Sequence, residues 1–264
     1  MILGIEADHI VHELLNYKLV GPIDAHVLLL IIASGILIVG FGWAAKAMPT
    51  SAPRNTGFLA LLEFGLVWVR DEVAYAFMGP EDGKKYLPFI WTLFFFVLVS
   101  NLLGLTPFPI SPGGLDKGDA FAVATGNIAV TAALALITFV LTTAAGFSRQ
   151  GPGKYFATLV PHGLPKVLVP LIFLMEFIGL FTKPFALMIR LFANMVAGHA
   201  LLAILFSMLV GVAALSGGQV ALTVVGIVGI VGVLLLEVLI SLLQAYIFAA
   251  LSATFIAMAI NPGH

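Results

Sequence analysis

Charged side chains and histidines are rare in the last third of the sequence, and five of them lie within apolar stretches. They are Glu176, Lys183, Arg190, His199 and Glu237. A charge at membrane depth costs roughly 2.5–3.5 kcal/mol on insertion scales, so such residues are functional by default. Histidine exchanges protons near neutral pH, and a carboxylate beside it can accept or release one. The residue types therefore predict proton transfer inside a membrane.

Three of these residues follow one another at intervals of seven. On a helix, a spacing of seven changes the direction of a side chain around the axis by only about 20°. The three residues, Glu176, Lys183 and Arg190, therefore form one polar stripe. Long apolar flanks argue against Arg190 as an interfacial anchor. Lys183 precedes a proline and suits a structural or interfacial charge as well as a functional one. For Glu176, helix packing and a place on a proton path remain equally open.

The turn Ser216-Gly217-Gly218 predicts that the two long helices around it pack antiparallel. Since the turn is centred between 217 and 218, the residue numbers of two facing positions then add to about 435. This register places polar residues opposite one another. The expected pairs are Arg190 with Gln244, Asn194 with Ser241, and His199 with Glu237. Positions 237, 241 and 244 also share one face of their helix. The alternatives are a static buried hydrogen bond for the third pair and, for the amides at 194 and 244, hydrogen bonds that only join the helices.

His199 lies nine residues after Arg190, which places it about 180° away on an ideal helix. The two side chains then face different surroundings unless Gly198 distorts the helix between them. The sequence leaves this open.

The elements that position these residues follow from composition. Of 264 residues, 61% are hydrophobic and 9% charged, against roughly 25% charged in soluble domains. No charged residue interrupts 27–45, 86–115, 120–148, 191–236 or 238–264, and about 20 apolar residues span a bilayer. The sequence predicts an all-α polytopic membrane protein.

We expect about five membrane-embedded helices in a single membrane domain over 1–264, plus one amphipathic surface helix. Gly226, Gly229 and Gly232 form a small-residue stripe suited to close helix packing. The expected parts are an outer arm at 1–25, spans at 26–48, 86–108 and 122–147, the surface helix at 55–78, and a tilted antiparallel hairpin of 167–215 and 219–260. For each of these last two blocks, two short spans or one long tilted or kinked helix remain open from length alone.

Basic residues set the orientation, because Lys and Arg gather on cytoplasmic connections. Five lie between the first two spans and three follow the third, among them Arg149 and Lys154. The N-terminus and the 109–119 loop are then outside, and the C-terminus is cytoplasmic.

Several function classes lack their sequence signals. A net charge of −1 gives no sign of a nucleic-acid partner, and the absence of cysteine excludes thiol chemistry and cysteine metal sites. There is no P-loop motif for a nucleotide. No His/Asp/Glu cluster has metal-ligand spacing. We therefore expect no cofactor and no metal.

The segment KPFALMIRLFANMVAGH at 183–199, with ISLLQAYIFAALSATFIAMA at 240–259 and the PHGLPK loop at 161–166, resembles subunit a of F-type ATP synthases. The resemblance covers most of the chain. It implies that Arg190 is the stator arginine, which faces the proton-carrying carboxylate of the rotating c-ring. It further implies a proton path with residues at Asn194, His199, Glu237, Gln244, Ser241 and Glu176.

The resemblance also implies partners and a place in the cell. These are the c-ring, the b/b′ peripheral stalk, the remainder of the F1F0 complex and membrane lipids, in the bacterial inner membrane. The chain is then a non-catalytic subunit of the proton-transporting complex. In one bacterial form of the family, the acid stands at the first of these two positions and the imidazole at the second. Here the order is exchanged, with His199 first and Glu237 second. The exchanged order resembles the mitochondrial arrangement and suggests an alphaproteobacterial source.

A proton-coupled secondary transporter is the alternative interpretation. It usually shows internal repeats with broken helices in matching positions, and the sequence shows none.

Overall fold

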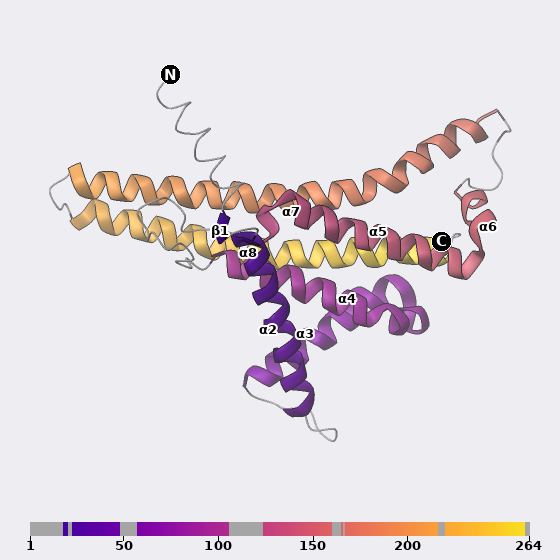
Figure 1. Cartoon of the computed structure of the whole chain (residues 1–264), viewed down its shortest axis with the longest axis horizontal. Coiled ribbons are helices and arrows are strands. Elements are labelled where there is room, and N and C mark those ends of the chain that lie inside the picture. The colour runs from indigo at the N-terminus through magenta and orange to yellow at the C-terminus, as the bar shows by residue number, and fades with distance from the viewer. Residues whose placement is uncertain are drawn as a thin grey trace. The chain divides into compact units, whose positions relative to one another are not determined.

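A computed structural model describes residues 18–20, 23–47, 57–105, 124–159, 165, 167–215 and 220–261 (Figure 1). The described chain is almost entirely helical, which confirms the expected fold class. Its single departure is a small antiparallel ladder between β1 (Lys18–Val20) and β2 (Ile23–Asp24). The loop at 109–119, the turn at 216–218 and most of the expected outer arm and of the PHGLPK loop lie outside the described residues.

The helices follow in the order α2 to α8. Their bounds are α2 Ala25–Ala47, α3 Phe58–Val69, η1 Arg70–Tyr75, α4 Ala76–Leu105, η3 Ala124–Gly126, α5 Ile128–Gln150, α6 Pro152–Ala157, α7 Val169–Leu215 and α8 Val220–Ile260. Within the described ranges, five helical stretches are long and apolar enough to cross a membrane, as expected: Val27–Lys46, Phe58–Leu105, Ile128–Gln150, Val169–Leu209 and Thr223–Ile260.

Helices α7 and α8 are each continuous, with 47 and 41 residues. At 1.5 Å per residue they reach about 70 and about 60 Å, whereas a bilayer core is about 30 Å thick. One long helix per block, rather than two short spans, is therefore what the structure shows. Such helices either tilt strongly or extend beyond the hydrocarbon core.

The stretch from α3 to α4 differs from the expected surface helix, turn and span. The sequence predicts a surface helix at 55–78 and a span at 86–108, with the turn Gly79–Lys85 between them. The structure confines the break to Gly79, whose φ of 75° suits glycine, and the helix resumes at Pro80. Proline is favoured at the first position of a helix because its missing N–H has no intrahelical partner there. The turn is tight because Gly83 packs on the backbone of Ala74, where a Cβ would lie 2.9 Å from the carbonyl oxygen.

The described residues divide into two compact units. The first unit comprises 1–38, 96–130 and 191–244, and the second comprises 39–95, 131–190 and 245–264. Each unit therefore takes one part of α4, of α7 and of α8.

Aromatic packing holds the second unit together. Trp68 of α3 contacts the rings of Phe94 in α4 and Tyr246 in α8, with centroids 6.0 and 5.4 Å away. The indole N–H of Trp91 donates to the Leu66 carbonyl at 2.9 Å, which ties α4 to α3. These contacts fix helices around one another without charged groups.

The far end of α8 is held in the same unit. The amide of Gln150, at the end of α5, donates to the Ala259 carbonyl at 2.7 Å. Tyr155 of α6 packs directly on Gly146, where a Cβ would overlap the ring. Burial raises the pKa of the Tyr155 hydroxyl above its ordinary value, so the ring is uncharged near neutral pH.

Candidate functional site

His199 lies in the first unit, on α7, with 5% of its surface exposed. Its Nδ1 lies 2.8 Å from the Met195 carbonyl oxygen, and its Nε2 lies 2.9 Å from the Gly104 carbonyl oxygen of α4. Whichever ring nitrogen carries a hydrogen donates it to the carbonyl beside it. The imidazole is thus oriented by its own helix on one side and by α4 on the other.

Glu237 of α8 is also buried, at 6% exposure. Its carboxylate lies against Gly198, where an added Cβ would sit 2.5 Å from Oε1. It interacts electrostatically with His199, and Oε1 has no hydrogen-bond partner among the described residues. Buried polar atoms are nearly always paired. A spare carboxylate oxygen beside an imidazole is therefore suited to taking up and releasing a proton.

Gly198 contributes space rather than a bend. Helix α7 continues through this position without a break. The missing side chain admits the carboxylate between the two helices. Arg190 is exposed and His199 is buried.

Ser241 and Gln244 continue the buried face of α8 from Glu237. The exposed fractions of Ser241 and Gln244 are 0% and 2%. The Asn194 amide donates to Gln244 Oε1 at 2.9 Å, whereas we expected Asn194 opposite Ser241, one turn away. Both side chains are long enough to reach along the helices, which explains the shift. Ser241 Oγ and Gln244 Nε2 have no hydrogen-bond partner in the described part of the chain.

The antiparallel register of the first unit rests on two close contacts between α7 and α8. Gly198 meets Glu237, and Gly226 meets Leu209, where a Cβ would lie 2.6 Å from the leucine. In both pairs the residue numbers add to the expected 435. The expected packing stripe at Gly226, Gly229 and Gly232 is wrong in part, because a Cβ at either of the last two would meet nothing within 4 Å.

The other predicted site residues lie on the part of α7 that belongs to the second unit. Arg190 is exposed, and Glu176 and Lys183 are partly exposed. The Lys183 ammonium lies 5.8 Å from the ring centre of Phe255 in α8. This is a cation–π contact, and it is consistent with a packing role for Lys183. The expected pairing of Arg190 with Gln244 stays a prediction.

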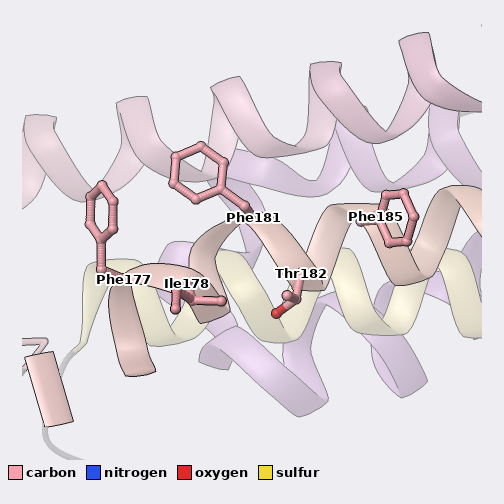
Figure 2. A pocket seen from close by; sticks show the side chains of 5 residues that line it. All are labelled: Phe177, Ile178, Phe181, Thr182 and Phe185. Carbon is pink, nitrogen blue, oxygen red and sulfur yellow. The ribbon is translucent and has the colours of Figure 1, made fainter. Parts of the chain in front are cut away.

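An apolar groove of about 450 Å³ lies on α7 in the second unit. All five of its lining side chains project from that one helix (Figure 2): Phe177, Ile178, Phe181, Thr182 and Phe185. Its one polar group, the Thr182 hydroxyl, donates to the Gly179 carbonyl at 3.2 Å. The groove therefore has no group that could move a proton.

Sequence reasoning missed three buried polar residues of the first unit, namely Ser100 and Asn101 of α4 and Thr125 of η3. The signal was a serine and an asparagine inside the otherwise apolar run FFFVLVSNLLGL. As for metals, no group of three His, Asp or Glu side chains within the described ranges is placed to hold an ion.

Comparison with known proteins agrees with the resemblance. The family model "ATP synthase A chain" matches residues 27–257. Three curated relatives are each described as ATP synthase subunit a. The protein of Myxococcus xanthus is 40% identical over 92% of this chain, and that of Anaeromyxobacter dehalogenans is 40% identical over 88%. The protein of Rhodospirillum rubrum is 38% identical over 89% of this chain. This chain spans 74%, 56% and 87% of their lengths.

These similar identities do not single out one bacterial lineage, so the suggested alphaproteobacterial source stays a prediction. The family model covers most of the sequence, including all the residues proposed for proton transfer. The chain belongs to the ATP synthase A chain family.

Proposed function

We propose that this multi-pass membrane protein is the proton-translocating stator subunit of the F0 sector. It forms two offset half-channels that load and unload the carboxylates of a rotating c-ring, with Arg190 between them. The observation that carries the proposal is the buried pair of His199 and Glu237, which interact electrostatically while one carboxylate oxygen has no hydrogen-bond partner among the described residues.

Protons enter from outside past His199 and Glu237, and each neutralises a ring carboxylate that then rotates into lipid. Ser241, Gln244 and Asn194 supply hydroxyl and amide groups along the same helix pair. These groups take up no proton, but they orient hydrogen bonds along the route. Near the end of a full turn, the carboxylate releases its proton to the cytoplasmic half-channel, where Glu176 is the acidic group.

Arg190 separates the two half-channels. Its guanidinium is always charged, so it carries no proton and instead favours the ionised form of a ring carboxylate. It is exposed on α7, as a residue that acts on a partner must be. Each proton that crosses 100 mV delivers about 2.3 kcal/mol, and several such steps drive one ATP at the distant catalytic sector.

The proposal includes the setting of the chain. The N-terminus lies outside and the C-terminus in the cytoplasm of a bacterial inner membrane, with residues 55–78 on the membrane surface. The exposed Phe58, Leu61 and Phe64 of α3 recur at every third position, which supplies an apolar face for that helix. The partners are the c-ring, the b/b′ stalk, the rest of F1F0 and lipids, with no nucleic acid and no catalytic role of its own.

The test is ATP-driven acidification of inverted membrane vesicles that carry Arg190→Ala, together with passive proton flux after removal of the soluble sector. We expect pumping to be lost and passive flux to remain. The matched control is Lys183→Gln on the same helix, which we expect to keep pumping because Lys183 packs on Phe255. Normal pumping by Arg190→Ala would refute the stator assignment. Proton flux that requires a co-substrate instead of ATP would favour the secondary transporter.

A further inference from the structure

The apolar groove on α7 has no part in the proposed proton route. Its three phenylalanine rings recur at every fourth position, at Phe177, Phe181 and Phe185 (Figure 2). All three are exposed. Contiguous exposed apolar surface of this kind marks a contact with lipid or with a partner protein, so the groove requires an occupant.

The proposed rotor contact does not reach the groove. Arg190, which we propose faces the c-ring, lies on the same helix and in the same unit. At 3.6 residues per turn, Phe181 lies about 180° from Arg190 around the axis, and Phe177 and Phe185 lie about 140° from it. The groove therefore faces away from the rotor side of α7.

A transmembrane helix of another subunit also fits the groove poorly. Close packing between membrane helices depends on small residues that let the two backbones approach. Here three rings, each one turn from the next, project from α7 (Figure 2). Rings of this size hold a second helix away, whereas a slender and flexible acyl chain can lie between them.

Basic side chains gather at one end of the same unit. The connection between α5 and α7 contains Arg149, Lys154 and Lys166 and no acidic residue. Arg149 and Lys154 are exposed, and neither forms an ion pair with another residue that the structure describes. Both charges are therefore open to an anionic ligand.

Helix α6 keeps Lys154 beside the end of α5. The ring of Phe147 in α5 contacts those of Tyr155 and Phe156 in α6, with centroids 5.1 and 5.9 Å away. Lys154 directly precedes this pair of rings, and Arg149 follows Phe147 by two residues. The fold thus brings two positive charges together where α5 ends.

The distance from these charges to the groove matches one lipid molecule. Phe139 of α5 contacts Phe181, with ring centroids 5.6 Å apart, and α5 and this part of α7 run in opposite directions (Figure 1). Arg149 is ten residues past Phe139, so it lies about 15 Å further along α5. Half of a bilayer core is also about 15 Å thick. A lipid whose headgroup lies at Arg149 therefore has acyl chains that reach the groove.

Unselective bulk lipid would explain the groove alone but not its position. The outer face of α5, with Leu136, Ile137 and Val140, is also apolar and exposed. Around the axis of α5, Arg149 lies about 80° from Phe139, beside the groove, but about 120–180° from those three residues. Anionic headgroups are attracted to basic residues at the membrane surface. The groove therefore has a charge that the outer face of α5 lacks.

We propose that the groove, together with Arg149 and Lys154, is a binding site for one anionic phospholipid of the cytoplasmic leaflet. The lipid phosphate lies between the two basic side chains, and one acyl chain lies along Phe177, Phe181 and Phe185. The inference goes beyond proton transfer. It rests on one part of the proposed function, the cytoplasmic position of the connection between α5 and α7.

Photocrosslinking identifies the occupant of the groove. Benzoylphenylalanine, which resembles phenylalanine and reacts with neighbouring C–H bonds under light, replaces Phe177 or, in a second variant, Phe185. The control carries it in place of Ile137, on the outer face of α5. Each intact complex is reconstituted into vesicles of equal parts phosphatidylglycerol and phosphatidylcholine. Mass spectrometry then gives the ratio of anionic to zwitterionic lipid adducts, which does not depend on how much complex assembles.

We expect this ratio to be at least about fivefold higher at 177 and 185 than at 137, the factor that one basic residue contributes at a membrane surface. Arg149→Gln combined with Lys154→Gln should lower it to the value at 137. Lys46→Gln, an exposed basic residue in the last turn of α2, is the matched control and should leave it unchanged. Equal ratios at all positions, or an adduct with another subunit in place of lipid, would overturn the proposal.

A labelling experiment separates this site from the proposed function. Gly153→Cys gives the chain its only thiol at a position with open space around it. A membrane-impermeant maleimide should label this thiol from the outside of inverted vesicles. Absence of labelling would refute the proposed orientation and, with it, a site in the cytoplasmic leaflet. Labelling together with equal lipid ratios would refute the lipid site alone.

Discussion

The two units of the chain bury different kinds of side chain. The first unit buries polar groups, namely Ser100, Asn101, Thr125, His199, Glu237, Ser241 and Gln244. Among the described residues of the second unit, the buried polar side chains are the hydroxyls of Thr131, Thr138 and Ser252, and the ring contacts of Trp68 join its helices. Rings pack helices at little electrostatic cost, whereas buried polar groups cost free energy unless they are paired. Unpaired polar groups of this kind therefore lower the stability of the first unit.

Buried hydroxyls make the same contrast at the level of single bonds. In the second unit, Thr138 and Ser252 donate to carbonyls four residues earlier, at 3.1 and 2.7 Å, so each is satisfied within its own helix. In the first unit, Thr125 bonds across elements and Ser241 Oγ has no partner among the described residues. Thr142 of the second unit is an exception, because its hydroxyl has no hydrogen-bond partner in the part of the chain that the structure describes. Polar groups that do not bond to a carbonyl of their own helix are available to the proposed proton route.

The largest expected effect is that of Glu237→Gln, which removes the carboxylate that interacts with His199. We expect ATP-driven pumping to fall at least about tenfold, because general acid–base groups contribute that much or more. Glutamine has nearly the same shape, so assembly should be normal. Glu72→Gln, an exposed residue of the second unit, is the control. Unchanged pumping by Glu237→Gln would remove Glu237 from the route.

A smaller effect is expected for Gly198→Ala, since the new Cβ would meet the Glu237 carboxylate. Overpacking costs about 1–3 kcal/mol, and moving the carboxylate relieves it, so pumping should drop severalfold. Glu237→Asp, one methylene shorter, should restore part of the rate in the double variant. Gly229→Ala, whose Cβ would meet nothing within 4 Å, is the matched control and should pump normally.

The corresponding change in the second unit should affect stability instead. Gly146→Ala would overlap the Tyr155 ring, and we expect the complex to lose about 1–3 kcal/mol, seen as a lower thermal unfolding midpoint in detergent. Pumping per assembled complex should stay the same. Gly153→Ala, which is open on all sides, should leave the midpoint unchanged. A loss of pumping at full assembly would break the contrast between the units.

The smallest effects compare two buried serines. Ser252→Ala removes a bond to its own helix and should cost no more than about 1.5 kcal/mol, with no change in proton flux. Ser241→Ala should slow flux about twofold to threefold, the value of one weak hydrogen bond. Passive flux per complex measures both, and equal effects would mean that Ser241 only packs the helices.

Uncharged runs bounded by Pro- and Gly-rich segments were enough to predict the number of membrane-long helices among the described residues, and the turn at 216–218 predicted the register of the α7–α8 contacts in the first unit. Periodicity likewise predicted that positions 237, 241 and 244 share a face. Contacts that depend on side-chain reach were not predictable in this way. Asn194 bonds to Gln244 instead of facing Ser241, because two flexible amides cover the distance of a helical turn.

Local backbone features were also missed. The π-helical turn Arg70–Tyr75 and the break at Gly79 alone arise from tertiary packing that local propensity does not encode. Asn101 was missed for a different reason. One asparagine in an apolar run is compatible with a loop end, a helix contact or a buried site, and only the fold brings Thr125 to it.

The contact between Gly198 and Glu237 also constrains how this sequence can change over time. The two positions share one fixed volume, since the carboxylate occupies the place of a methyl group at 198. A substitution that adds an atom at 198 is then compatible with a shorter side chain at 237, but not with glutamate. Among related sequences, we expect the residue types at these two positions to be inherited together, with either change alone rarely retained.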